Sequence, residues 1–147
     1  MENLTAPGRP FKIRTSSVLK RSGEFAGKNM ADGKEETCWN SDQGSPQWIL
    51  IEFLRAVALS RVRIMFQGGF VGQDALIQVG EEDSAEALRV VASLEGGIIE
   101  DSNEMQTFDL AESDNAGRFV RITFPSSTDF YGRVTIYSLE LWGRDKG

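Results

Sequence analysis

The stretch Ser60-Arg61-Val62-Arg63-Ile64-Met65-Phe66-Gln67 alternates polar and apolar side chains over most of its length. Alternation with a period of two predicts a β-strand, because successive side chains of a strand point to opposite faces. Five further segments, 75–80, 88–94, 105–110, 119–124 and 133–142, have strand-forming patterns, and 48–53 is apolar enough for a strand covered on both faces. About seven or eight short strands separated by turn signals predict an all-β, antiparallel sandwich.

Helical character is confined to two places in the sequence. A turn is expected near residues 25–30, and residues 84–91 contain good helix formers, so this segment is either a helix or one arm of a hairpin. We expect one domain over residues 16–143, with residues 1–15 forming a mostly flexible N-terminal arm. Residues 144–147 are expected to form a C-terminal tail.

Composition excludes several kinds of chemistry. The 147 residues contain no histidine and one cysteine, Cys38. Without histidine there is no Ser/His or Cys/His nucleophile pair and no His-ligated zinc, so we expect no enzyme. The 16 Lys and Arg residues against 22 Asp and Glu residues give a net charge of −6, which disfavours direct binding to nucleic acid or anionic membranes. The polar N-terminus has no secretory pattern, so nucleus and cytoplasm are the expected locations.

One loop and several strands carry a family pattern. Asp32-Gly33, Thr37 and Trp39 precede a strand that begins with Trp48, and Phe66-Gln67-Gly68 ends a later strand. Together with residues 116–124 and 137–143, they resemble the discoidin family, also called the coagulation factor V/VIII type C or galactose-binding-like domain. The resemblance covers residues 16–143 and implies a jelly-roll β-sandwich with binding loops at one end.

Three segments, 35–44, 66–70 and 129–134, resemble an intracellular branch of this family more closely. Residues 71–104 carry less of that likeness. The branch associates with an orphan nuclear receptor, so the resemblance implies a protein-binding corepressor that reduces binding of the receptor to its DNA element.

The resemblance also implies a calcium site. Its ligands would be the carbonyl of Asn29 and the side chains of Asp32, Thr37 and Glu140. Oxygen ligands suit a hard cation, but Lys34 stands where calcium-binding members have an oxygen-bearing side chain. In the alternative interpretation, Asp32 caps the backbone amides of the loop and Lys34 pairs with Asp32 or Glu140.

A second set of candidate site residues belongs to the loops at one end of the sandwich. The set comprises Gln67, Phe70, Phe130, Tyr131 and Arg133, and it predicts a surface for a protein partner. The same groups could stack a sugar ring and bind its hydroxyls, so a glycan is the alternative ligand, and a lipid headgroup is a weaker one. Trp48 and Phe70 are expected to bury or seal the end of the sandwich, whereas Phe130 and Tyr131 are expected to be exposed.

Overall fold

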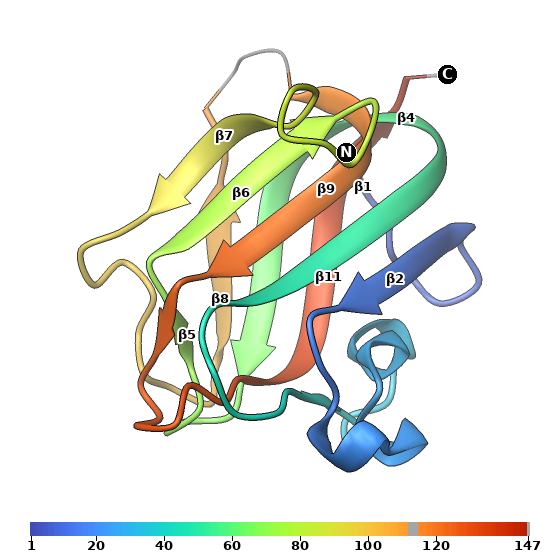
Figure 1. The fold of residues 1–147 in the computed structure, drawn as a ribbon. Coiled ribbons are helices and arrows are strands. Elements are labelled where there is room, and N and C mark those ends of the chain that lie inside the picture. Colours follow the sequence, from blue (N-terminus) through green and yellow to red (C-terminus); the bar gives the residue numbers. More distant parts are fainter. Residues whose placement is uncertain (112–114, 147) are drawn as a thin grey trace.

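The computed structural model describes residues 1–111 and 115–146 (Figure 1). Its strands are β1 (Glu2–Asn3), β2 (Phe11–Thr15), β3 (Trp39–Asn40), β4 (Gln47–Phe66), β5 (Gly72–Gln73), β6 (Ala75–Gly80), β7 (Arg89–Leu94), β8 (Met105–Asp109), β9 (Ala116–Phe124), β10 (Ser126–Ser127) and β11 (Thr135–Asp145). Three short 3₁₀ turns, η1 (Leu19–Arg21), η2 (Gly23–Phe25) and η3 (Gly27–Ala31), precede β3. Residues 112–114 and Gly147, the last residue of the predicted tail, lie outside the described part of the chain.

The long strand β4 connects the two layers of the sandwich (Figure 1). Its first part pairs with β2 and β9, and its second part pairs with β8 and β11. All these pairings are antiparallel, and β6 and β7 extend the sheet beyond β9. The predicted all-β antiparallel sandwich is confirmed. The two strands predicted at 48–53 and 60–67 are parts of β4, whose pairing with β9 shifts register between Glu52 and Val57.

The core lies between these layers and is filled by the inward-facing side chains of each strand. Phe66 on β4 meets Phe124 on β9, with ring centroids 5.8 Å apart and an edge-to-face angle of 75°. Trp39 is fully buried, and its indole Nε1 donates to the Ser17 carbonyl at 2.8 Å. Each fully buried large apolar side chain contributes roughly 1.5–3 kcal/mol, so this core holds the sandwich together without a disulfide.

The N-terminal residues predicted to form a flexible arm belong to the sandwich instead. β1 pairs with β11, and the backbone amide of Leu4 donates to the Leu141 carbonyl at 2.7 Å. β2 pairs with β4 along its whole length, and the ring of Phe11 lies 6.4 Å from that of Phe53. The physical reason is that apolar side chains hold this segment to the sandwich: Leu4 is buried, and Phe11 and Ile13 pack against the core. At the other end, β11 continues to Asp145, into the predicted tail.

The segment at residues 84–91, for which the sequence allows a helix or one arm of a hairpin, belongs to a hairpin. β7 begins at Arg89 and pairs antiparallel with β6, so the acidic stretch at residues 81–83 lies in the connection between them. Pairing with β6 takes residues 89–94 into the sheet, while the helix formers at 84–88 form only a turn in the connection, where the Leu88 amide donates to the Ser84 carbonyl at 2.9 Å. The turn expected near residues 25–30 corresponds to η2 and η3. Within the described residues, no helix has the length and apolar character needed to cross a membrane.

Candidate binding site at the loop end

Three connections meet at one end of the sandwich, and we call this surface the loop end. It comprises residues 41–46 between β3 and β4, 67–71 between β4 and β5, and 128–134 between β10 and β11. Backbone hydrogen bonds join them: the amide of Gly44 donates to the Tyr131 carbonyl at 2.8 Å, and the amide of Thr128 donates to the Val71 carbonyl at 2.9 Å. The strands therefore bring together loops that are far apart in the sequence.

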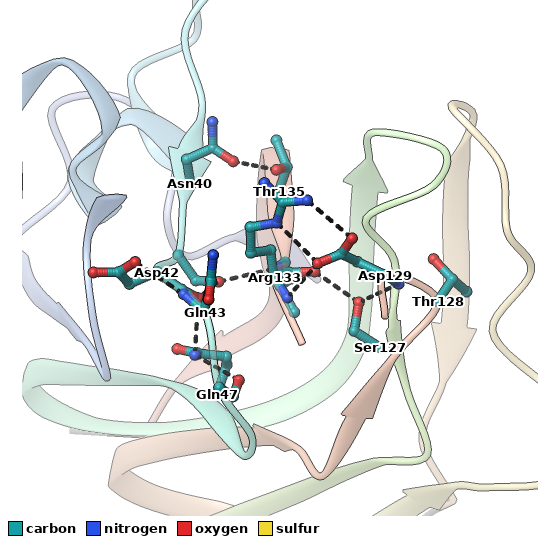
Figure 2. A network of polar contacts seen from close by, with 12 residues as sticks. Asn40, Asp42, Gln43, Gln47, Ser127, Thr128, Asp129, Arg133 and Thr135 are labelled. Carbon is teal, nitrogen blue, oxygen red and sulfur yellow. Dashed lines mark hydrogen bonds and ion pairs between the residues drawn. The ribbon is translucent and has the colours of Figure 1, made fainter. Parts of the chain in front are cut away.

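An ion pair between Asp129 and Arg133 holds the 128–134 loop in shape (Figure 2). Arg133 Nε donates to Asp129 Oδ2 at 2.9 Å and Nη2 donates to Oδ1 at 3.1 Å, while the Arg133 backbone amide also donates to Oδ2 at 3.1 Å. These hydrogen bonds from Arg133 lower the pKa of the Asp129 carboxyl below its usual value and raise the pKa of Arg133. The charged form of Asp129 is therefore part of the folded loop.

Gly132 allows the tip of this loop to approach its neighbour closely. It has φ of +84°, and a Cβ built at this position would lie 2.5 Å from the Gly44 carbonyl oxygen. Only glycine adopts this conformation without strain while leaving room for that contact. The turn before it places Phe130 and Tyr131 at the tip.

The buried side-chain amide of Gln47 supports the 41–46 loop. Gln47 Oε1 accepts hydrogen bonds from the hydroxyls of Ser16 at 2.5 Å and Ser17 at 2.8 Å. Gln47 Nε2 donates to the carbonyls of Asp42 at 3.1 Å and Gly44 at 2.9 Å (Figure 2). With all its hydrogen-bonding capacity used, this amide ties the loop to the chain that precedes η1.

Phe130 and Tyr131 are the exposed aromatic residues of the loop end. Phe130 is 93% exposed and Tyr131 is 56% exposed, and their rings meet edge to face with centroids 5.3 Å apart at 88°. The Arg133 guanidinium lies 5.6 Å from the Tyr131 ring centroid and 5.1 Å from that of Phe70. Four of the five predicted residues, Phe70, Phe130, Tyr131 and Arg133, are thus brought together.

Gln67 and Phe70 mainly support the structure of the loop end. Phe70 is half-buried beneath the Arg133 guanidinium, as expected for a residue that seals the end of the sandwich. The backbone amide of Gln67 donates to the Thr135 carbonyl at 3.0 Å, which fixes the start of the 67–71 loop. Trp48 is half-buried on the outer face of β4, where the Arg121 guanidinium covers it at 4.4 Å from the ring centroid.

The predicted calcium ligands do not converge as a set of four. Thr37 Oγ1 donates to Asp32 Oδ2 at 2.6 Å and lies 3.5 Å from the Asn29 carbonyl oxygen, so these three residues meet. Glu140 is directed elsewhere, since its Oε1 accepts from Arg63 Nη1 at 3.0 Å and from Trp142 Nε1 at 2.8 Å.

The loop itself satisfies the Asp32 carboxylate. Oδ1 accepts from the Lys34 backbone amide at 2.9 Å, which is the capping role of the alternative interpretation. Calcium needs about 6–8 oxygen ligands, whereas this loop offers three converging ones and a neighbouring lysine. The arrangement therefore does not fit a calcium ion, and it favours a structural role for Asp32.

Sequence reasoning omitted two residues that position the site, Asp129 and Gln47. The signal for Asp129 was present as an acid four residues before Arg133, with a glycine between them. Gln47 carried no local signal, because its partners Ser16 and Ser17 are 31 and 30 residues away in the sequence.

Cys38, the single cysteine, is buried. This burial, and to a smaller extent the charge of Glu24, raises the pKa of its thiol.

The fold and the order of its strands place the chain in a known domain family. The F5/8 type C domain matches residues 12–138, and the chain belongs to this family. Among its relatives are proteins named Nuclear receptor 2C2-associated protein. The Danio rerio protein is 42% identical over 131 residues, covering 88% of this chain and 89% of the relative. The Xenopus laevis protein is 43% identical over 131 residues, covering 88% and 91%.

Solved structures show the same fold at lower sequence similarity. Chitosan-binding module 1 from the chitosanase/glucanase of Paenibacillus sp. IK-5 superposes with a TM-score of 0.76 at 20% identity. The match covers 97% of this chain and 100% of the module. This likeness establishes the architecture of the sandwich.

Proposed function

We propose that this protein is a non-enzymatic protein-binding module that associates with a nuclear receptor through the loop end. The exposed Phe130–Tyr131 pair on a rigid tip carries the proposal. The names of the relatives support a receptor as the partner, with nuclear receptor 2C2 as the first candidate. Binding would act as corepression by reducing the engagement of the receptor with its DNA element, and it would take place in the nucleus as well as the cytoplasm.

Exposing an aromatic ring to water is unfavourable in free energy. Phe130 leaves nearly its whole side chain in water, so transfer into an apolar pocket of a partner is favourable. Large aromatic side chains of this kind dominate the binding energy of many protein interfaces. The Asp129–Arg133 ion pair and the close approach at Gly132 have already ordered the tip, which lowers the entropy lost on binding.

The charge of the chain indicates how a DNA effect would arise. At −6 the protein is repelled by phosphate, so it would act on the receptor and not on the DNA. A bound acidic module would cover part of the receptor surface and oppose the approach of DNA phosphates.

Equilibrium binding to purified nuclear receptor 2C2 tests this proposal. The double variant Phe130→Ala/Tyr131→Ala should weaken binding by about tenfold or more, a change of about 1.4 kcal/mol or more. The matched control is Leu54→Ala/Val90→Ala, which removes two exposed apolar side chains that are 58% and 55% exposed and lie outside the loop end; it should bind normally. Equal affinity of the wild type and the Phe130/Tyr131 variant would refute the proposed interface.

A gel-shift titration separates association from corepression. Adding the wild-type protein should reduce the fraction of receptor bound to its DNA element, and the Phe130→Ala/Tyr131→Ala variant should not. If the receptor binds the protein and its DNA element together without loss, the corepressor part of the proposal fails while the association remains.

A glycan is the second candidate ligand, favoured by the exposed aromatic rings beside Arg133. Two features make it the weaker candidate. The Phe130 and Tyr131 rings stand at 88° to each other and give no shared flat platform for a sugar, and Asp129 already engages the Arg133 guanidinium. Saturable binding on a glycan array that is lost in Phe130→Ala, without receptor binding, would reverse the order of the two candidates.

A further inference from the structure

We infer that the loop end is built for a positively charged protein segment, in which Lys or Arg side chains flank the apolar pocket that receives Phe130. This inference rests on the proposed function and specifies the chemistry of its partner. The observation behind it is a set of exposed acidic residues on two segments bonded to the loop end: Asp42 in the 41–46 loop, and Glu100, Asp101 and Glu104 beside the 67–71 loop.

The segment 100–104 is fastened beside the 67–71 loop. Asp101 Oδ1 accepts from the backbone amide of Gly69 at 2.8 Å, and Asn103 Oδ1 accepts from that of Gly68 at 2.7 Å. Phe70, next in the chain, lies under the Arg133 guanidinium, which also faces Tyr131. A continuous chain of contacts thus connects the acidic segment to the aromatic tip. Asp101, Glu100 and Glu104 are all exposed beside it.

Asp42 lies in the 41–46 loop, which is bonded to the tip through Gly44. It is exposed, and its Oδ1 accepts from the backbone amide of Gln43 at 2.9 Å (Figure 2). Two residues further on, the amide of Gly44 is bonded to the Tyr131 carbonyl at 2.8 Å, so Asp42 is held near the base of the tip. The Phe130–Tyr131 pair is therefore flanked by negative charge from two different loops.

These four carboxylates have no basic partner in the described part of the chain. Over residues 1–111 and 115–146, no Lys or Arg forms an ion pair with Asp42, Glu100, Asp101 or Glu104. The cation of the loop end, Arg133, is already paired with Asp129. The balance around the apolar tip is thus negative, which is complementary to a basic partner surface and disfavours an acidic one.

The test compares two triple variants that remove the same amount of charge. Glu100→Gln/Asp101→Asn/Glu104→Gln neutralises the acidic side of the loop end and keeps a carbonyl acceptor for the Gly69 amide. The control, Glu81→Gln/Glu82→Gln/Glu86→Gln, changes the β6–β7 connection at the opposite end of the sandwich (Figure 1). Association with nuclear receptor 2C2 is measured from about 0.05 to 0.5 M salt, a range that screens exposed charges.

We expect the loop-end variant to associate about tenfold or more slowly at low salt, with most of the difference lost at high salt, while the control behaves as wild type. Equal slowing in both variants, or no salt dependence, would overturn the inference. If Phe130→Ala/Tyr131→Ala still abolishes binding in that case, the proposed function stands without the charge component.

A second measurement does not depend on the receptor. Fluorescence anisotropy compares a peptide with lysines around a leucine-rich centre against a peptide in which glutamates replace those lysines. The wild-type protein should bind the lysine peptide at least about tenfold more tightly, and less tightly after the loop-end substitutions. If the lysine peptide does not bind more tightly than the glutamate peptide, the inference is wrong. If the lysine peptide is preferred but nuclear receptor 2C2 does not bind, the proposed function fails and the inferred partner chemistry remains.

Discussion

Asp129 engages Arg133 through both carboxylate oxygens, with Nε 2.9 Å from Oδ2 and Nη2 3.1 Å from Oδ1. Asp129 precedes Phe130 and Tyr131 in the sequence and Arg133 follows them, so the ion pair joins the two ends of the turn that carries the aromatic side chains. The shape of the tip and the charge state of Asp129 are therefore coupled.

This coupling predicts a pH-dependent effect of Asp129→Asn. The pKa of Asp129 is lowered in the folded protein, so its contribution is present above its unfolded pKa of about 3.9 and disappears as the pH falls through the lower folded pKa. In urea unfolding, the variant should be less stable than wild type at pH 7, and the difference should shrink in strong acid.

The control for this prediction is Asp145→Asn, because the Asp145 carboxylate and Arg55 are largely exposed and 3.8 Å apart. Such surface pairs contribute little, about 0–1 kcal/mol, so this variant should follow wild type at both pH values. A difference for Asp129→Asn that is the same at pH 7 and in acid would show that the carboxylate charge does not stabilise the loop.

Gly132→Ala should damage the tip without changing either aromatic residue. A methyl group at this position would clash with the Gly44 carbonyl oxygen at 2.5 Å and would also strain a φ of +84°. Gly96→Ala is the matched control, since Gly96 has φ of +75° but no other atom within 4 Å of its Cβ position. Strain alone costs about 1–3 kcal/mol.

We therefore expect a larger fall in melting temperature for Gly132→Ala than for Gly96→Ala, and weaker receptor binding in the first variant alone. Equal melting temperatures for the two variants would mean that the close contact between the 41–46 and 128–134 loops is not needed.

Calcium should leave the melting temperature unchanged. The Asp32 carboxylate is occupied by Thr37 and the Lys34 amide, and Glu140 is held by Arg63 and Trp142. Differential scanning calorimetry in about 5 mM calcium should therefore match a sample in chelator, because even weak extracellular calcium sites have dissociation constants of about 0.1–1 mM. A rise of several degrees would restore calcium as a ligand of this loop.

The fold was largely predictable because its main signal is local. The alternation in residues 60–67 and 119–124 indicates strands without knowledge of their partners. The continuity of β4 and the ordering of the first fifteen residues were not predictable in this way. Both depend on long-range pairing, of β4 with four neighbouring strands and of Phe11 with the ring of Phe53.

The candidate site was predictable in part for the same reason. Phe130 and Tyr131 lie between an aspartate and a glycine, a local pattern that indicates an exposed turn, and the structure exposes both. What holds them there comes from elsewhere in the chain: Gly44 contacts Tyr131, and Gln47 supports Gly44 through an amide bonded to Ser16 and Ser17. Sequence position alone gives no signal for contacts of this range.

The Phe130–Tyr131 tip is the proposed contact surface for the partner. Hydroxyl-radical footprinting of the protein, alone and bound to nuclear receptor 2C2, measures this directly, because free Phe130 is 93% exposed and should be oxidised readily. We expect strong protection of Phe130 and Tyr131 in the complex, with unchanged oxidation of Leu54. Protection elsewhere on the sandwich while Phe130 stays as reactive as in the free protein would contradict it.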